Sequence, residues 1–312
     1  MKFGRYLYLL TITAVMLAAV SSCEKDDEDD IILGGGGTTP VTPRPDPNPD
    51  PNPDPNPVSA NKYTGRIEVP ALKSGNLFIQ HSTKEDNDSV MAFCLEYDTK
   101  ANHSRWVAFR FDSKTRGTGA GRSDDFRDDP YLPSQYWIGS NGFGSGYDRG
   151  HICASADRQY STRANSETFC MTNMSPQMSR FNQDYWTGFE GKVQSWGRDK
   201  NFADTLYVVK GGTVGGGQTL GTISRNGKNV VIPKYYFMAV LQCKNNAYKA
   251  IGFWMEHKDY GIKDPSNAEL ATKIVTIDEL EENTGIDFFH NLPDAVENAV
   301  EATVTPSAWG FK

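Results

Sequence analysis

Alternating proline over residues 45–57 determines where a compact domain can begin in this chain. Every second residue from Pro45 to Pro57 is proline, with Asp or Asn between. Proline locks φ and lacks a backbone N–H, so this run can join neither a helix nor a sheet ladder. The run predicts an extended polyproline II spacer of about 3.1 Å per residue. We therefore expect the folded domain after it, over residues 61–312.

The chain before this spacer begins like an exported protein. Lys2 and Arg5 precede an apolar stretch over residues 6–20, which is followed by small residues. A short basic region, an apolar core of this length and small residues before a break are typical of a secretory signal peptide. The stretch is too short for a membrane-spanning helix, which needs about 20 residues. We expect residues 1–22 to be a signal peptide.

The end of this segment resembles a bacterial lipoprotein signal, with the sequence Leu17-Ala18-Ala19-Val20-Ser21-Ser22-Cys23. In such signals the cysteine is lipidated and becomes the new N terminus. The leucine lies farther from the cysteine than is usual, and a plain cleaved signal peptide is the alternative. We expect lipidation of Cys23.

Residues 24–30 contain six acidic side chains. Such a run is usually a solvated spacer, but directly after Cys23 it also resembles the surface-export tag of some bacterial lipoproteins. We expect residues 23–60 to be a disordered, lipidated, acidic and Pro-rich tether. The protein would then be an exported outer-membrane lipoprotein, periplasmic or at the cell surface, and the N-terminal lipid would be its only membrane contact.

The formal net charge of −7 would at face value argue against a nucleic-acid substrate, because proteins that bind nucleic acid usually carry a basic surface. That charge is unevenly distributed. Residues 24–57 hold nine acids and two bases, so the tether accounts for it and residues 58–312 are close to neutral. Composition therefore does not exclude a nucleic acid.

Apolar or alternating runs separated by polar turns predict antiparallel strands. They lie at residues 77–79, 90–97, 106–111, 206–209, 235–241 and 250–255. Residues 178–196 contain no proline and carry apolar side chains at helical spacing, which predicts a helix. Shorter helices are predicted at 277–282 and 295–303. Strands and helices do not alternate regularly, so the predicted class is α+β, a mainly antiparallel sheet with packed helices in one domain.

Four cysteines remain beyond Cys23, and their state is open. An exported chain enters a compartment that permits disulfides, whereas cysteines in apolar strands are also common as buried thiols. No C-x-x-C spacing is present, which argues against a structural zinc site. The four are Cys94, Cys153, Cys170 and Cys243.

The residues with catalytic potential collect between positions 147 and 190. His151 closely follows Arg149, between a glycine-rich stretch and an apolar one. Histidine is the side chain best suited to accept a proton at neutral pH, and arginine binds phosphate through two hydrogen bonds. Each of the two has a structural alternative when taken alone. His151 would have a structural role, and Arg149 would pair with Asp148.

Asn182 and Glu190 lie eight positions apart on the predicted helix. This spacing is about 80° beyond two full turns, so both project to one broad side. Amide and carboxylate oxygens suit Mg²⁺, which keeps most of its waters. The alternative for both is a solvated helix surface. A proton acceptor, a hard metal ion and a guanidinium are together the groups needed to attack a phosphodiester.

The order of these motifs resembles that of the DNA/RNA non-specific endonucleases, the ββα-metal or His-Me finger group. The elements shared with that family follow one another as Asp148-Arg149-Gly150-His151, Thr172-Asn173 with Pro176-Gln177, Asn182 with Trp186, and Glu190. Upstream, Arg122 opens a segment similar to the family's R-x-x-x-F-x-x-D-P, although Arg116 and Arg127 compete for that role. The similarity covers residues 76–293.

The resemblance implies a ββα-metal core and a role for each matched residue. His151 would end a strand and act as the general base, and Asn182 would be the direct protein ligand of Mg²⁺, with Mn²⁺ as a substitute. Glu190 would orient the metal's waters from the second shell, and Asn173 would help to hold the site. Arg149 and Arg122 would stabilise phosphate charge.

The function implied is an Mg-dependent, sugar-non-specific endonuclease that hydrolyses DNA and RNA by His-activated water and leaves 5′-phosphate ends. A homodimer would agree with the resemblance, because related enzymes are often dimers. Two alternatives belong to other classes. One is a catalytically inactive surface lipoprotein that binds nucleic acid, and the other is a narrower phosphodiesterase that acts on small nucleotides or lipids.

Overall fold

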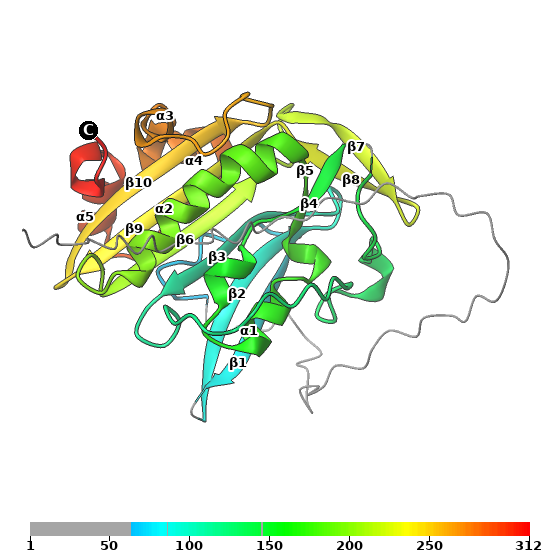
Figure 1. Cartoon of the computed structure of the whole chain (residues 1–312), viewed down its shortest axis with the longest axis horizontal. Coiled ribbons are helices and arrows are strands. Elements are labelled where there is room, and N and C mark those ends of the chain that lie inside the picture. The colour runs from blue at the N-terminus through cyan, green and yellow to red at the C-terminus, as the bar shows by residue number, and fades with distance from the viewer. Residues whose placement is uncertain (1–63, 86, 145) are drawn as a thin grey trace, which may run out of the picture.

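The computed structural model describes residues 64–312 except residues 86 and 145 (Figure 1). The predicted signal peptide, tether and lipidation site therefore lie outside the described residues. Within the described part, none of the helices combines the length and the apolar character that crossing a bilayer requires.

One seven-stranded sheet forms the centre of the fold, in the order β1-β2-β3-β6-β9-β10-β11. All neighbouring pairs are antiparallel, which confirms the α+β class with a mainly antiparallel sheet. The strands are β1 (Leu77–Glu85), β2 (Asp88–Asp98), β3 (His103–Phe111), β6 (Thr205–Gly212), β9 (Tyr235–Lys244), β10 (Ala247–Glu256) and β11 (Ile274–Val275). The first six contain the six predicted strands and extend beyond them, because polar residues continue each ladder into its turn.

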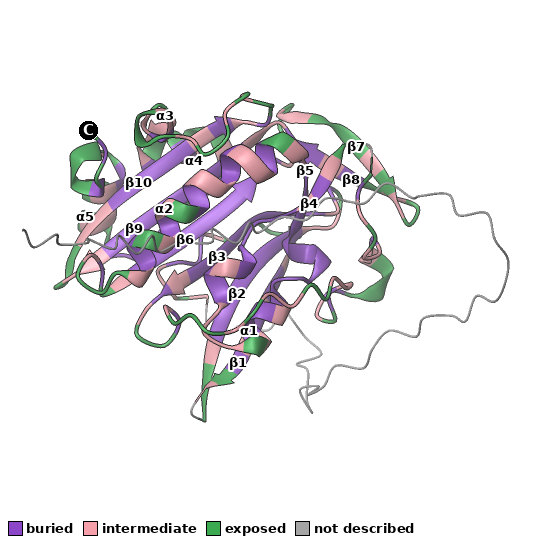
Figure 2. Ribbon diagram, in the orientation of Figure 1, coloured by how far each residue is buried: buried purple, intermediate pink, exposed green. Residues whose placement is uncertain are grey.

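Both faces of this sheet are buried, as the purple central strands in Figure 2 show. Side chains alternate across a strand, so Trp106 and Ala108 of β3 enter one core while Val107 and Phe109 enter the other. A sheet covered on both sides needs apolar residues at consecutive positions. This explains the continuous apolar runs in the sequence.

Helices cover the two faces separately (Figure 1). On one face lies α2, whose Phe189, Val193 and Trp196 enter the first core. On the other face α4 contributes Ile277 and Leu280 to the second core. The helices are α1 (Thr162–Glu167), α2 (Thr187–Arg198), α3 (Asn267–Ala271), α4 (Ile277–Thr284) and α5 (Asp294–Glu301), so both predicted short helices are present.

The helix predicted over 178–196 differs from expectation at its start. Residues Phe181–Trp186 form a π-helical turn, and α2 continues from it. A π turn inserts extra chain into a helix and is frequent at functional sites. It cannot be inferred from apolar spacing, because the side chains of Phe181 and Tyr185 remain buried in the core on either geometry.

Two two-stranded sheets stand apart from the main sheet. β4 (Tyr147–His151) pairs with β5 (Met174–Met178), and β7 (Thr219–Arg225) pairs with β8 (Lys228–Pro233). The pair β4-β5 is followed directly by the π turn and α2. Two antiparallel strands and a helix in this order form the ββα unit that the resemblance implied.

Close packing inside this unit explains one glycine of the D-R-G-H motif. A Cβ atom on Gly150 would lie 2.1 Å from Gln177 Oε1 and 2.6 Å from its Cγ. No rotation of the far end of Gln177 relieves the second contact. β4 and β5 therefore pack as they do only with glycine at this position.

We expect Gly150→Ala to lower the free energy of unfolding by about 1–3 kcal/mol, because overpacking forces neighbouring atoms to shift. Gly191→Ala is the matched control, since nothing lies within 4 Å of a Cβ at that exposed position of α2. It should instead stabilise the helix by about 0.5–1 kcal/mol. Urea denaturation measures both. Equal effects of the two substitutions would contradict the packing argument.

Candidate active site

His151 is the last residue of β4 and pairs with Met174 of β5. Its side chain is fully buried, and the rings of Phe126 and Phe169 approach it edge-on with centroids 5.8 and 4.8 Å away. Neither ring nitrogen has a hydrogen-bond partner among the described residues. A buried polar group without a partner is costly, so this ring is set up for a group that the protein itself does not supply.

The surroundings of His151 keep its ring neutral. Burial and then the positive charges of Arg122, Arg149 and Lys210 hold the pKa of His151 well below its usual value. At neutral pH the imidazole therefore has a free lone pair. It can accept a proton, which is the role predicted from the sequence.

Two arginines lie above the aromatic rings that flank His151. The Cζ of Arg122 is 4.9 Å from the centroid of Phe169, and that of Arg149 is 3.7 Å from the centroid of Phe126. Both terminal nitrogens of Arg122 are buried and have no hydrogen-bond partner in the described part of the chain. The two guanidinium groups create a positively charged site beside a neutral base, which suits a phosphate.

The structure distinguishes Arg122 from its two competitors in sequence. Arg116 donates to the backbone carbonyls of Ala203 and Asp204, so its guanidinium is used in joining loops. Arg122 and Arg127 each pair with a nearby acid, but a terminal nitrogen of Arg127 bonds Asp125 at 2.8 Å, whereas Arg122 pairs with Asp124 through Nε and keeps both terminal nitrogens without a partner among the described residues. Neither Arg116 nor Arg127 contributes to the charge that acts on His151.

Asn182 lies in the π turn and is fully buried. Its amide nitrogen donates to Oδ2 of Asp148 at 3.0 Å, and Gln183 donates to the same oxygen at 2.8 Å. Ser179 donates to the other oxygen of Asp148 at 2.7 Å. Asp148 thus fixes the amide of Asn182 through its nitrogen.

Glu190, one turn into α2, is 2% exposed. Its Oε1 lies 3.7 Å from Nζ of Lys210, and the same ammonium is 2.8 Å from Oδ2 of Asp157. Burial opposes the charge on Lys210, but attraction to Asp157 and Glu190 outweighs it and raises the lysine pKa. No motif pointed to Lys210, which follows an apolar run on β6.

Asn173 acts on the backbone around the site. Its amide nitrogen donates to the carbonyls of Cys153 and Thr168 at 2.9 and 2.7 Å, and its amide oxygen accepts from the backbone N–H of Cys153 at 2.8 Å. The two contacts to Cys153 hold the chain that leaves β4 just after His151, and the third joins it to the end of α1 at Thr168. Asn173 is therefore placed as a positioning residue.

Asn182, the predicted Mg²⁺ ligand, and Glu190, which is expected to orient the metal's waters, have chemistry that suits this ion. An amide oxygen from Asn182 and a carboxylate from Glu190 are hard oxygen donors, which Mg²⁺ prefers. Both side chains are buried, and Asp148 orients the first while Lys210 anchors the second. The residues present therefore fit a hard divalent cation.

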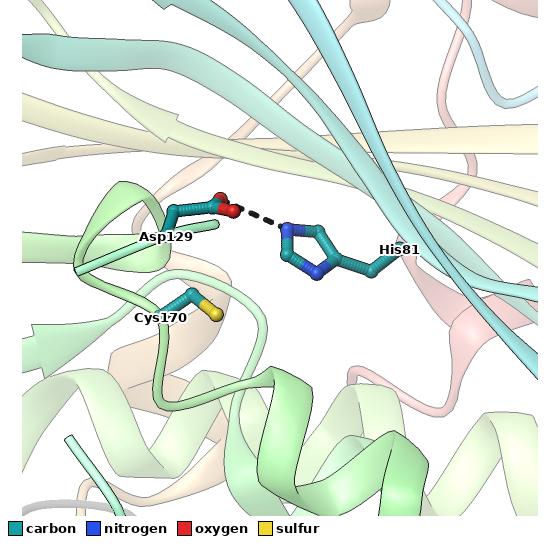
Figure 3. A group of neighbouring side chains, drawn as sticks. All are labelled: His81, Asp129 and Cys170. Atoms are coloured by element: carbon teal, nitrogen blue, oxygen red, sulfur yellow. Dashed lines mark hydrogen bonds and ion pairs between the residues drawn. The ribbon is translucent and has the colours of Figure 1, made fainter. Parts of the chain in front are cut away.

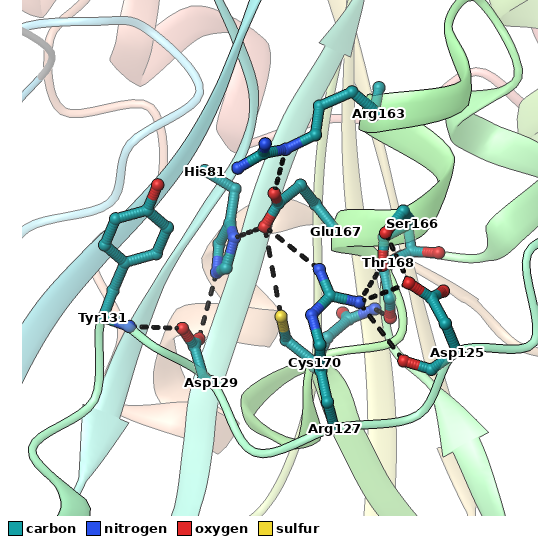
Figure 4. Close-up of polar contacts among 12 residues, drawn as sticks. His81, Asp125, Arg127, Asp129, Tyr131, Arg163, Ser166, Glu167, Thr168 and Cys170 are labelled. Atoms are coloured by element: carbon teal, nitrogen blue, oxygen red, sulfur yellow. Dashed lines mark hydrogen bonds and ion pairs between the residues drawn. The ribbon is translucent and has the colours of Figure 1, made fainter. Parts of the chain in front are cut away.

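A second histidine, His81 on β1, lies fully buried between two carboxylates (Figure 4). Its Nδ1 is 2.6 Å from Oε2 of Glu167, and its Nε2 is 3.0 Å from Oδ2 of Asp129. Burial opposes a charge on the ring, but these carboxylates outweigh it and raise the pKa of His81 to about 9. His81 is therefore an imidazolium at neutral pH. Sequence reading missed it because its partners are 48 and 86 positions away.

The spacing of His81, Asp129 and Cys170 would suit a metal ion, since their ligand atoms lie within 4.8 Å of one another (Figure 3). The existing contacts favour another reading. Both ring nitrogens of His81 already have carboxylate partners, Glu167 and Asp129, and the Cys170 thiol lies 4.0 Å from Glu167. Asp129 also accepts a hydrogen bond from Thr172. The group is thus an ion-paired network that fastens the segment carrying Arg122 to the sheet.

All four cysteines of the described residues are free thiols. Cys94, Cys153 and Cys170 are buried, and Cys243 is half-buried. Of the two states that the sequence left open, the structure has the reduced one.

A ββα unit with a neutral buried histidine, two guanidinium groups, a buried amide and a buried carboxylate is typical of a metal-dependent phosphodiester hydrolase of the ββα-metal class. The sequence matches the DNA/RNA non-specific endonuclease family over residues 73–295. The chain belongs to this family and is a metal-dependent endonuclease.

The similar proteins found by sequence comparison are named as nucleases. A nuclease from Nostoc sp. (strain PCC 7120) is 34% identical over 223 residues, which cover 68% of this chain and 76% of that protein. Human mitochondrial endonuclease G is 27% identical over 212 residues, covering 64% and 68%. The crystal structure of an EndoG/EndoGI complex, which concerns EndoG inhibition, matches with a TM-score of 0.58 and 20% identity over 70% of this chain and 89% of that chain.

We expect His81→Gln to lower the free energy of unfolding by about 3–5 kcal/mol at pH 6, because removing one partner of a buried ion pair leaves the other charges uncompensated. A folded-state pKa raised from 6.5 to about 9 contributes stability that is complete below pH 6.5 and is lost as the pH rises through 9. The difference in free energy of unfolding between wild type and variant should therefore narrow from pH 6.5 to 9. Chemical denaturation across this range measures it.

His103→Gln is the control for this experiment. His103 is equally buried, but burial lowers its pKa to about 4, so it stays neutral throughout the range. The difference in free energy of unfolding between His103→Gln and wild type should be constant from pH 6.5 to 9. A constant difference for His81→Gln as well would show that His81 carries no charge.

Proposed function

We propose that this chain hydrolyses DNA and RNA with Mg²⁺ or Mn²⁺, using water activated by His151, and leaves 5′-phosphate ends. The observation that carries the proposal is the state of His151. Its ring is neutral, fully buried and without a hydrogen-bond partner among the described residues, beside two guanidinium groups.

Arg122 and Arg149 would bind the phosphate that is to be cut. A guanidinium donates two parallel hydrogen bonds to phosphate oxygens, and the terminal nitrogens of Arg122 have no partner in the described protein. The incoming phosphate would offset part of the positive charge that lowers the pKa of His151. Substrate binding would therefore make His151 a stronger base at the moment it is needed.

His151 would accept the proton of the attacking water. The same arginines disfavour the resulting imidazolium, which promotes return of the proton to solvent after the reaction. Asn173 would keep the ring in place through the backbone of the following residues. The attacking group is water, so a substrate 2′-hydroxyl is not needed, and both DNA and RNA qualify.

Asn182 would hold the metal ion directly through its amide oxygen, and Glu190 would orient the water ligands. When bound, Mg²⁺ neutralises charge on the phosphate and on the leaving oxygen. Asp148 and Lys210 keep these two side chains fixed through the contacts described above. This preorganisation is the protein's own contribution to metal binding.

We expect the purified protein to nick a supercoiled plasmid with Mg²⁺ and to stop when EDTA is added. His151→Ala should lower the rate by about 10²–10⁴-fold, the usual contribution of a general base. His290→Ala is the control, because His290 lies in the segment that packs on the opposite face of the sheet. Agarose gels measure cutting, and phosphatase-dependent end labelling identifies 5′-phosphates.

Other outcomes separate the alternatives. Absence of nicking with either Mg²⁺ or Mn²⁺ would favour the inactive nucleic-acid-binding protein. Hydrolysis of small phosphodiesters alone would favour the narrower phosphodiesterase. Cleavage restricted to RNA and independent of metal would show that the mechanism is wrong.

We further propose that the protein is an exported lipoprotein, tethered through Cys23 by the acidic and Pro-rich segment. The support is the order of basic, apolar and small residues before Cys23. A cell that expresses the full chain should incorporate labelled palmitate into it, and Cys23→Ser should abolish incorporation. Cys243→Ser should leave it unchanged. Label that persists in the Cys23 variant would refute this anchor.

A further inference from the structure

Helices α4 and α5 contact each other and β10 near the C-terminal end of the chain (Figure 1). Asp278 and Glu281 on α4 and Glu301 at the end of α5 each direct one carboxylate oxygen to a common point. The three oxygens lie within 4.8 Å of one another. Three carboxylates at this separation repel one another unless something positive joins them.

Glu301 makes the group more than a surface cluster of acids. Its side chain is 4% exposed, and its Oε1 is buried without a hydrogen-bond partner among the described residues. Burial of a carboxylate that is neither paired nor hydrogen-bonded is strongly unfavourable. The buried oxygen therefore requires either a proton or a cation.

The charges around Glu301 offer no internal cation. The charged groups that act on Glu301 are Glu281, Glu297, Asp278 and Asp287, and all four are acids. Glu281 accepts a hydrogen bond at 2.7 Å on its Oε1 from the backbone N–H of Phe288, which is a neutral donor. This is the opposite of the network around His81, where an imidazolium and arginines neutralise the acids.

We propose that Asp278, Glu281 and Glu301 form a second divalent-cation site, for which Ca²⁺ is the best-suited ion. Calcium accepts six to eight oxygens at about 2.3–2.6 Å in flexible geometry, so oxygens on opposite sides of the ion are about 5 Å apart. Three carboxylates within 4.8 Å meet that requirement, and the exposed side of Asp278 leaves room for water. Magnesium needs a stricter octahedron.

The site would be structural and separate from the nuclease centre. α4 packs on the face of the sheet opposite to α2, which carries Glu190. The family match ends at residue 295, so Glu301 lies beyond it. A cation here would tie α5 to α4 and fasten the C-terminal helix of this particular chain.

Thermal unfolding and calcium binding of the full chain test the proposal. An Asn182→Ala background removes the metal ligand of the nuclease centre. In that background, after EDTA treatment and dialysis, about 10⁻³ M Ca²⁺ should raise Tm by about 3 °C, as expected for a tenfold excess over Kd. Equilibrium dialysis with radioactive calcium should show one bound ion. NaCl of equal ionic strength should leave Tm unchanged.

Glu301→Gln, added to this background, should abolish both responses. Glutamine has the shape of a protonated glutamate, so without Ca²⁺ this variant should unfold at a temperature no lower than its parent, which separates ligand loss from misfolding. Glu282→Gln is the matched control, an exposed acid on α4 outside the group, and should keep both responses. The proposal is overturned if the parent neither binds nor responds to Ca²⁺, or if Glu301→Gln responds equally.

Discussion

The buried ammonium of Lys210 connects the parts on which the nuclease centre depends. It lies on the central strand β6, 2.8 Å from Asp157 in the turn that follows β4, and 3.7 Å from Glu190 on α2. The main sheet, the turn that follows β4 and helix α2 therefore meet at one charge. A buried charge of this kind is stable only while its partners stay in place, so the three elements have little freedom to move apart. Its field also reaches His151, whose ring it helps to keep neutral.

Polar groups in the interior are handled in three different ways. Around Lys210 and His81, opposite charges neutralise each other without solvent. At His151 and Arg122, polar nitrogens lack partners in the described protein. Between α4 and α5, acids face acids. Because unpaired buried groups are costly, the second and third cases mark places where the fold has kept a binding capability at the expense of stability.

Local patterns predicted the strands and the long helix, because each depends on residues close together in the sequence. Apolar runs identified β3 and β9, and a four-residue motif singled out His151, which the structure places buried at the end of β4. The network of His81, Asp129 and Glu167 was missed because only the folded chain brings those residues together. Lys210 was missed for a related reason: at the end of an apolar strand it looks like an ordinary boundary residue. The π turn at Asn182 changes backbone geometry without changing the apolar spacing from which a helix is inferred.

The free thiols have a consequence for the folding of this domain. No disulfide joins any part of the described chain, and three of its four cysteines are buried. The native state is thus held by packing, hydrogen bonds and ion pairs, and its formation needs neither an oxidant nor a disulfide isomerase. A reducing compartment would therefore not prevent folding of the domain. Premature exposure of the thiols would be the hazard, since an unfolded chain in an oxidising compartment offers several wrong pairings and no right one.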